Sequence, residues 1–286
     1  MRNNVSENSK CKGENRMKLG LMKIAIVLIA FLFVGCATAP VVESNSLSSA
    51  QNTERELRVG VSPTYPPVIF RQNENITGIE ADLARKLGGA MKRPVSFVVL
   101  KWEDEIPALL EGTIDIIMSG MSITRAREVR IAFAEPFLKS GLIAAFRVED
   151  SKKYTSKESI LNGTVTVGAV KGTTGDAFVQ RNFPKAVRTT FFPKAQDGVY
   201  ELKRRSIDIF VNDAPSIIWL VSENEADIAA LWEPLTEEYL AWGVRKEDQQ
   251  FLMDVNSILK QWKQDGTLNE VLRKWLPEGY FKRINQ

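Results

Sequence analysis

Short apolar runs alternate with longer amphipathic segments from about residue 57 to residue 276. The runs have the length and branched side chains of buried strands, and the longer segments repeat apolar residues at helical spacing. Strands are predicted at residues 57–61, 95–100, 114–118, 141–147, 164–168, 189–192 and 207–211. Helices are predicted at residues 79–91, 102–111, 175–183, 195–204, 214–222, 249–264 and 267–275, with another from about residue 125. This alternation predicts an α/β fold with mainly parallel sheets.

A weak internal repeat suggests two lobes that are built alike. Residues 109–122 and 201–216 both lead from a helix through Thr or Ser into Ile-Asp-Ile, an apolar pair and then polar residues. Asp115 and Asp208 occupy the same place in the two copies, 93 positions apart. The alternative is chance similarity between two examples of a common strand–helix pattern.

Residues 114–127 carry the clearest chemical signal. A buried-strand run stops at the small polar residues Ser119, Gly120 and Ser122, and an expected helix containing Arg127 follows. In α/β sheets, ligands bind at the carboxyl ends of strands. Helix N-termini favour anions, and arginine can hold a carboxylate with two hydrogen bonds. We therefore expect an anion site; the alternative is a turn whose hydroxyls cap the helix and whose arginines are solvated.

Composition excludes several kinds of chemistry. The 286 residues include no histidine, which removes the commonest general base and metal ligand. The two cysteines, Cys11 and Cys36, lie near the N-terminus, so we expect neither a metal nor a cofactor in the folded part. Of 38 basic and 35 acidic side chains, six and two lie in residues 1–35, which leaves 32 and 33 elsewhere. This near-neutral body gives no reason to expect nucleic-acid binding.

The N-terminal segment is predicted to be a lipoprotein signal peptide. Residues 24–34 form an apolar run that is too short to span a bilayer but suits a signal peptide, and Gly35-Cys36-Ala37 follows it. Cleavage would leave Cys36 as the lipid-bearing N-terminus after a leader of residues 1–35, although Phe33 stands where the pattern usually has leucine. The alternative is an ordinary secretory signal. Residues 36–56 are rich in Ser, Ala, Asn and Thr and read as a flexible tether.

The ordered motifs of the chain resemble those of the family 3 periplasmic solute-binding proteins, the polar amino-acid receptors of ABC importers. The resemblance covers about residues 57–276. The motifs are LRVGVSPTYPP (57–67), GIEADLARKLG (78–88), IPALLEGTIDIIMSGMSITRAREV (106–129), VGAVKGTTG (167–175), IDIFVNDAPS (207–216) and LKQWKQDGTLNEVLRKWL (259–276).

This resemblance implies a type II periplasmic-binding-protein fold, in which two α/β lobes are joined by two crossing strands and close over a ligand. The first lobe is expected to comprise residues 57–147 plus 242–286, and the second lobe residues 148–241. Such a protein is expected to act as a monomer that passes a small amino acid to an ABC permease, from the periplasm or cell surface, where its lipid anchors it.

The resemblance also implies a binding site for the ligand carboxylate. Arg127 matches the arginine that grips this group, and Ser122 matches a donor in the same loop. Thr173 and Thr174 match donors from the second lobe. Their residue types fit the role, because a buried carboxylate needs several donors. The alternative is that Thr173 and Thr174 only cap the helix that follows them.

Further matched residues would hold the rest of the ligand. Asp213 matches the acid that receives the ammonium group, although it could instead cap the next helix. Tyr65 and Trp102 match two aromatics that sandwich the ligand side chain, with ordinary core packing as the alternative. Ser119 and Gly120 match positions that line the pocket.

One position departs from the pattern of the family. Many members carry an acid, which meets a cationic ligand side chain, where this chain has Ser62. Lysine, arginine and ornithine are therefore disfavoured as ligands, and an uncharged polar or small apolar amino acid is expected.

Two other functions stay open. Some relatives on this fold resemble dehydratases that act on cyclohexadienyl compounds, and an enzyme without histidine would need a poised carboxylate or lysine. Glu80, Glu103 and Lys171 are possible candidates, but nothing in their local sequence marks them. The third possibility is a ligand-sensing lipoprotein that signals to a partner protein.

Replacing Cys36 with serine should release the protein from membranes, because stable anchoring needs the several acyl chains of a lipoprotein. Fractionation of cells expressing the parent and the variant checks this expectation. A serine variant that sediments with membranes as fully as the parent would rule out lipidation at Cys36.

Overall fold

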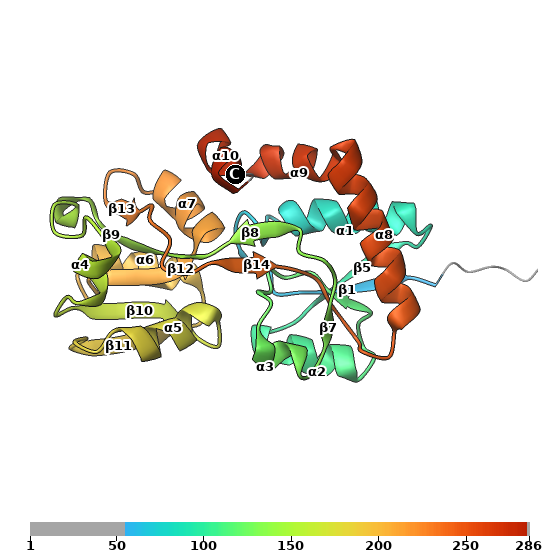
Figure 1. The fold of residues 1–286 in the computed structure, drawn as a ribbon, viewed down its shortest axis with the longest axis horizontal. Helices are drawn as coiled ribbons and strands as arrows, with labels where there is room; N and C mark the ends of the chain where they lie inside the picture. Colours follow the sequence, from blue (N-terminus) through green and yellow to red (C-terminus); the bar gives the residue numbers. More distant parts are fainter. Residues whose placement is uncertain (1–54, 285–286) are drawn as a thin grey trace, which may run out of the picture. The chain divides into compact units, whose positions relative to one another are not determined.

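A computed structural model describes residues 55–284 (Figure 1). The predicted leader, Cys36 and nearly all of the predicted tether therefore lie outside the described residues. The described part contains two five-stranded sheets, one three-stranded sheet and one two-stranded sheet, with helices between the strands. The α/β class predicted from the alternation of elements is confirmed.

The first large sheet has the strand order β5-β1-β6-β15-β7. β1 pairs in parallel with β5 and β6, whereas β15 is antiparallel to β6 and β7. The strands are β1 (Leu57–Val61), β5 (Val95–Val99), β6 (Ile116–Ile117), β7 (Ala132–Phe133) and β15 (Gly243–Val244).

The second large sheet repeats this arrangement in the order β11-β10-β12-β9-β13. β10 pairs in parallel with β11 and β12, and β9 is antiparallel to β12 and β13. The strands are β9 (Leu142–Arg147), β10 (Thr166–Val170), β11 (Arg188–Phe192), β12 (Ile209–Asp213) and β13 (Ile228–Leu231). Each sheet thus defines one lobe, with four strands that run in one direction and a single strand, β15 or β9, that runs against both of its neighbours.

Two crossing strands, β8 (Leu138–Ser140) and β14 (Glu238–Leu240), pair with each other and run between the lobes (Figure 1). The strand that follows the first crossing, β9, belongs to the second sheet. We therefore propose that the chain leaves the first lobe at about residue 141, six residues before the expected boundary at residue 147.

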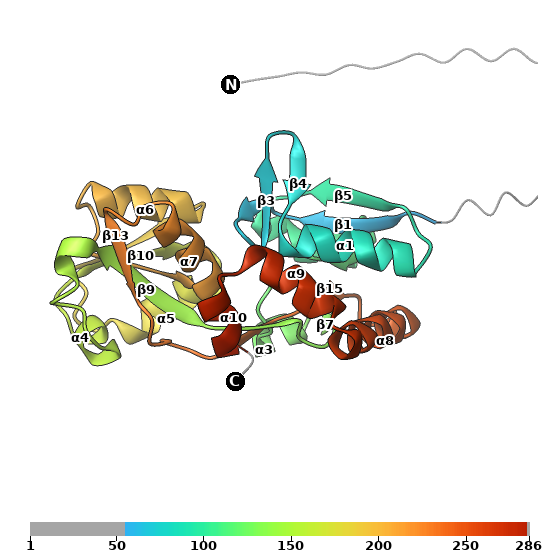
Figure 2. The ribbon, with the colours of Figure 1, turned by 90° about the horizontal axis from the view of Figure 1, so that it is seen from above.

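Most helices lie close to the limits predicted from long periodic segments, whereas the short helices at residues 148–150, 157–161 and 278–284 were not predicted. In the first lobe the helices are α1 (Ile79–Ala90), η1 (Trp102–Asp104), α2 (Glu105–Leu110), α3 (Arg125–Glu128), α8 (Gln249–Asp265), α9 (Thr267–Trp275) and α10 (Glu278–Ile284). In the second lobe they are η2 (Val148–Asp150), α4 (Lys157–Leu161), α5 (Thr174–Asn182), α6 (Ala195–Lys203) and α7 (Ala214–Ser222). The small sheet β2 (Thr64–Tyr65), β3 (Ile69–Gln72) and β4 (Asn75–Thr77) extends beside β1, as Figure 2 shows.

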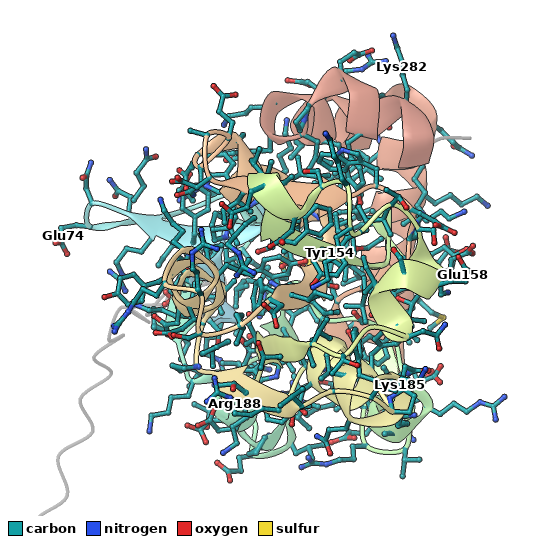
Figure 3. All side chains as sticks on the ribbon, turned by 90° about the vertical axis from the view of Figure 1, so that its left-hand side faces the viewer. Glu74, Tyr154, Glu158, Lys185, Arg188 and Lys282 are labelled. Atoms are coloured by element: carbon teal, nitrogen blue, oxygen red, sulfur yellow. The ribbon has the colours of Figure 1, made fainter. Side chains whose placement is uncertain are left out.

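Each lobe has its own apolar core. Trp242 is fully buried in the first lobe and stacks on Phe137 with a centroid distance of 5.7 Å. In the second lobe, Tyr154 packs on Phe146 at 5.2 Å and lies inward, whereas charged side chains such as Glu158 lie at the periphery (Figure 3). Separate cores allow each lobe to act as one rigid unit.

The internal repeat corresponds to a matched set of polar contacts. In the first lobe, Asp115 accepts a hydrogen bond from the backbone of Arg58 at the start of β1 and forms an ion pair with its side chain. Arg245, which follows β15, lies 3.7 Å from the same carboxylate. The guanidinium of Arg245 also donates to the carbonyl oxygens of Leu109 and Ile114.

The second lobe contains the same contacts. Asp208 accepts from the backbone of Thr166 at the start of β10 and pairs with Arg147 at the end of β9, at 3.0 Å. The guanidinium of Arg147 donates to the carbonyl oxygens of Leu202 and Ile207, the counterparts of those bound in the first lobe. In both lobes, an arginine that lies shortly after a crossing strand fastens the chain to the receiving lobe. This agreement favours two lobes built alike over chance similarity.

Replacing Asp115 with alanine should destabilise the first lobe. Its side chain is only 4% exposed, and its loss leaves Arg58, Arg93 and Arg245 without their shared anion. We expect a loss of about 2–4 kcal/mol in the free energy of unfolding. Urea denaturation, with the exposed Asp104→Ala as the control, measures it.

The contribution of Asp115 should also depend on pH. Burial alone would raise the pKa of Asp115, but hydrogen bonds from Arg58 and the charges of Arg58 and Arg93 lower it overall. Its stabilisation is therefore present above the ordinary carboxyl pKa of about 3.9 and is lost as the pH falls through the lower value of the folded protein. Equal stability of the parent and Asp115→Ala at neutral pH would contradict this role.

Candidate functional site

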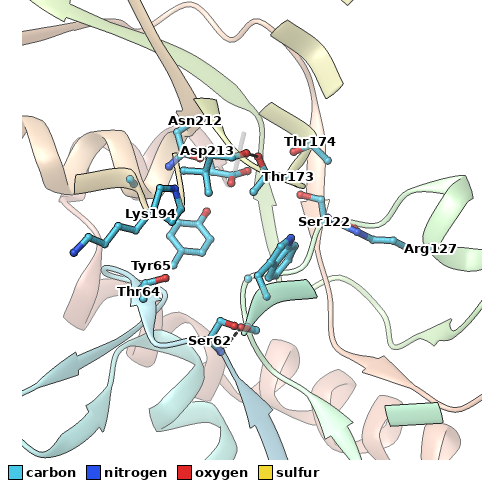
Figure 4. Close-up of a pocket in the computed structure, with 16 residues that line it drawn as sticks. Ser62, Thr64, Tyr65, Ser122, Arg127, Thr173, Thr174, Lys194, Asn212 and Asp213 are labelled. Atoms are coloured by element: carbon cyan, nitrogen blue, oxygen red, sulfur yellow. Dashed lines mark hydrogen bonds between the residues drawn. The ribbon is translucent and has the colours of Figure 1, made fainter. Parts of the chain in front are cut away.

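A cavity between the two lobes collects the carboxyl ends of strands from both sheets. Its volume is about 590 Å³, including the open mouth. All ten residues predicted to contact a ligand line it, and Figure 4 shows those of the second lobe facing those of the first. They are Ser62, Tyr65, Trp102, Ser119, Gly120, Ser122, Arg127, Thr173, Thr174 and Asp213.

Arg127 provides a half-buried cation at one side of the cavity. The N-cap Thr124 starts α3, and the guanidinium of Arg127 donates to the carbonyl oxygen of Ser122 at 2.7 Å and lies 5.1 Å from the Trp102 ring centroid. Among the described residues, no carboxylate comes within 4.0 Å of it. Burial lowers the pKa of Arg127, and the charges of Asp213 and Glu238 oppose this shift. The group can still bind an anion.

The two threonines of the second lobe have different roles. The hydroxyl of Thr173 donates to the carbonyl oxygen of Val170 at 2.7 Å and accepts from the backbone of Asp176, so it caps α5 as the alternative prediction stated. Thr174 is the first residue of α5, and it lines the cavity. Its hydroxyl and the first amides of α5 are donors that this lobe can offer to an anion.

Asp213 ends β12 and immediately precedes α7. Its side chain makes no capping hydrogen bond, and Oδ1 is buried without a partner. Burial and the charge of Glu238 raise the pKa of Asp213 to about 7, against the hydrogen bond of Tyr65 and the charge of Arg127. The capping alternative is therefore not realised, and the carboxyl can accept a donor from within the cavity.

Two aromatic residues of the first lobe frame the cavity. The phenol of Tyr65 points toward Asp213 (Figure 4), and burial and the charge of Asp213 raise the pKa of Tyr65. Trp102 donates from Nε1 to the carbonyl oxygen of Gly172 in the second lobe at 3.0 Å. Trp102 thereby links the lobes, a role that the sequence did not indicate.

The loop at Ser119-Gly120 is held from beneath. Ser119 Oγ accepts from the backbone of Ser62 at 2.8 Å, and the amide of Gly120 donates to Glu80 Oε2. Gly120 has φ +69°, and a Cβ there would lie 2.4 Å from the Tyr65 ring. Gly120 therefore makes room for Tyr65, and its amide is directed away from the cavity.

Six lining residues were missed from the sequence. Thr64 lies beside Tyr65, and Asn212 precedes Asp213, so both were next to predicted positions. Lys194 precedes α6 at the carboxyl end of β11, where the rule for ligand sites in α/β sheets could have found it. The complete set is Thr64, Val170, Pro193, Lys194, Ala195 and Asn212.

Two acids lie beneath the cavity floor. Glu80 on α1 and Glu105 at the start of α2 are both completely buried. Burial raises the pKa of Glu80 well above its usual range and that of Glu105 to about 8, against the hydroxyls of Ser119 and Ser62. The sequence contained a signal for the burial of Glu105 that was not used: this acid shares a helix face with the apolar residues Ala108 and Leu109.

The described residues hold no cluster of three or more His, Cys, Asp or Glu side chains that could bind a metal ion. In the same part of the chain, no helix combines the length and apolar character that a membrane span requires.

Comparison with known proteins relates this site to a family. The family model for "Bacterial extracellular solute-binding proteins, family 3" matches residues 57–278. The chain is 27% identical to the ABC transporter arginine-binding protein 1 of Escherichia coli K12 over 240 residues, covering 82% of this chain and 96% of that protein.

Solved structures share the fold. A putative binding component of an ABC transporter from Wolinella succinogenes, complexed with lysine, has a TM-score of 0.74 and 28% identity over 79% of this chain and 98% of its own. An ancestral amino-acid-binding protein, a precursor of cyclohexadienyl dehydratase, has a TM-score of 0.71 and 31% identity over 78% of this chain and 95% of its own. The two-lobed type II fold expected from the motifs is thereby confirmed.

Proposed function

Because the chain belongs to the bacterial extracellular solute-binding proteins, family 3, we propose that it captures a small zwitterionic amino acid and delivers it to an ABC permease. The relatives named as amino-acid-binding proteins support this function. The proposed location is the periplasm or cell surface, with the protein a monomer anchored through a lipid on Cys36.

One observation carries the proposal: the cavity contains a half-buried cation and a buried acid that are not paired with each other. Arg127 comes from the first lobe and Asp213 from the second, and both line the same space. A buried charge without a partner is costly. An α-carboxylate on Arg127 and an α-ammonium on Asp213 would satisfy both charges together.

The remaining lining residues then surround the side chain of the ligand. The carboxylate would also receive hydrogen bonds from Thr174 and the start of α5. The side chain would extend over Ser62, with Tyr65 and Trp102 providing apolar area. Since donors lie on both lobes, a ligand stabilises the closed arrangement through contacts that an open cleft does not make.

Binding is favoured over catalysis by the surroundings of the acids. Among the described residues that line the cavity, Asp213 carries the carboxyl group, and this group is needed to hold the ammonium group of the ligand. Glu80 and Glu105 are fully buried and do not line the cavity. The similarity to a dehydratase precursor keeps the enzyme as a second candidate. Incubation with a cyclohexadienyl amino acid, followed by ultraviolet absorbance, should show no aromatic product.

Replacing Arg127 with alanine should weaken amino-acid binding by about 10²- to 10³-fold or more. The loss leaves a desolvated carboxylate without its cation, at a cost of roughly 3–5 kcal/mol, and each 1.4 kcal/mol is about tenfold in Kd. A thermal-shift screen of the twenty amino acids first identifies the ligand that stabilises the protein most. Titration calorimetry with that amino acid then measures the effect. Arg125→Ala, an exposed arginine on the same helix, is the matched control, and a folded Arg127→Ala that binds within a few-fold of the parent would overturn the site.

Affinity for a neutral amino acid should rise with pH. Asp213 must be ionised to hold an ammonium group, and its pKa in the free protein is raised to about 7 by burial and Glu238. The affinity should therefore increase by about tenfold per pH unit from pH 5 toward pH 7 and then level off. Asp213→Asn should bind weakly without this slope. A parent protein whose Kd is constant between pH 5 and pH 7 would exclude this role for Asp213.

A further inference from the structure

Glu105 is a fully buried acid whose place in the site is so far unexplained. It is the first residue of α2, its exposure is 0%, and neither of its carboxyl oxygens has an aligned hydrogen bond in the described part of the protein. Buried polar groups normally have partners. A carboxyl without them points to a second state in which its charge or its proton is used.

Two hydroxyls separate Glu105 from the cavity. Ser62 and Ser119 line the cavity, and both hydroxyls are near enough to the Glu105 carboxyl to lower its pKa, although neither forms an aligned hydrogen bond with it. Ser62 Oγ donates to the carbonyl oxygen of Leu100 at 2.9 Å, so its remaining capacity is to accept. A protonated Glu105 can supply that hydrogen, and an ionised Glu105 can accept one from Ser119.

The charges that face Glu105 make the choice between these states close. Glu80 on α1 is a buried acid that interacts with it, and Arg127 on α3 is the cation whose charge favours its ionised form. Arg127 is also shared with Asp213 and Glu238. With burial dominant, the pKa of Glu105 is raised to about 8, so the group holds its proton at neutral pH.

Ser62 lies on the floor opposite Asp213, where a ligand side chain would extend (Figure 4). We propose that Glu105 is a proton-storing specificity residue: it keeps its proton under a neutral ligand side chain and releases it to solvent under a cationic one. The inference rests on the proposed function and extends its ligand class. One pocket then accepts both neutral and cationic amino acids. The ionised Glu105, acting through the two hydroxyls, replaces the acid that many family members carry at the position of Ser62.

Arginine and citrulline form a matched pair of probes, because citrulline replaces the guanidinium with a neutral group of nearly the same shape. Titration calorimetry at pH 7 in two buffers of different ionisation enthalpy counts the protons released. Asp213 contributes equally to both ligands. We expect arginine to release roughly one proton more than citrulline, since Glu105 is mostly protonated in the free protein.

Glu105→Gln, which resembles the protonated acid, should abolish the difference in proton count and weaken arginine binding more than citrulline binding. Glu111→Gln changes an exposed acid next to the same helix and should leave the difference intact. If Glu105→Gln does not fold, the parent protein still provides a test. Its preference for arginine over citrulline should increase on the order of 10- to 100-fold between pH 6 and pH 8 and change little above that.

The outcomes separate this inference from the proposed function. Equal proton release by the two ligands, or a preference that does not change with pH, overturns the role of Glu105 and leaves amino-acid capture standing. If other amino acids bind but neither arginine nor citrulline does, the role of Glu105 is likewise overturned and amino-acid capture still stands. Failure of all twenty amino acids to bind overturns the proposed function and this inference with it.

Discussion

A cation and an acid that face one cavity from opposite lobes, without a counter-ion in the protein, are the constraint on which the site depends. Arg127 is half-buried and Asp213 is buried, and neither lobe supplies a counter-ion within ion-pair distance among the described residues. Removing a charge from water is costly unless a partner replaces the lost solvation. A zwitterion of the right length supplies both partners together, and it can do so only while the lobes are near each other.

The scaffold meets this constraint by repeating one unit. Both sheets have four strands in one direction and one antiparallel strand in the fourth place, and both place their polar loops at the carboxyl ends of the parallel strands. An arginine follows each crossing strand: Arg147 comes after β8, and Arg245 comes after β14. Each of them binds the chain to the lobe that it enters, through two backbone carbonyls and an aspartate. Such fastening keeps each lobe rigid and leaves the short crossing segments near residues 141 and 241 as the places where bending can occur.

Contacts between protein groups also join the lobes directly. Trp102 donates to Gly172 across the cleft, and Phe70 on β3 packs against Trp219 on α7 with a centroid distance of 5.5 Å. These contacts add to the stability of the closed arrangement without touching the charged ends of a ligand. Affinity therefore depends on both the ligand contacts and the lobe contacts, because closure makes them together.

The sequence by itself determined the features that depend on local patterns. Periodicity fixed the long helices and the parallel strands, and a polar segment after a buried strand located Arg127, because these signals lie within a few neighbouring residues. Several strands of two to four residues, such as β7 and β14, carry too little pattern to be recognised, whereas β6 was found because its two residues lie in a longer apolar run. The apolar run at residues 142–146 predicted β9 as a strand but not which sheet it joins, because a strand that is apolar on both faces suits either sheet. Tertiary structure alone decided that the Gly120 amide serves Glu80, that Asp213 is not a cap, and that Glu105 lies under Ser62. Each of these three roles depends on residues that are distant in the sequence and on the exclusion of water by those residues.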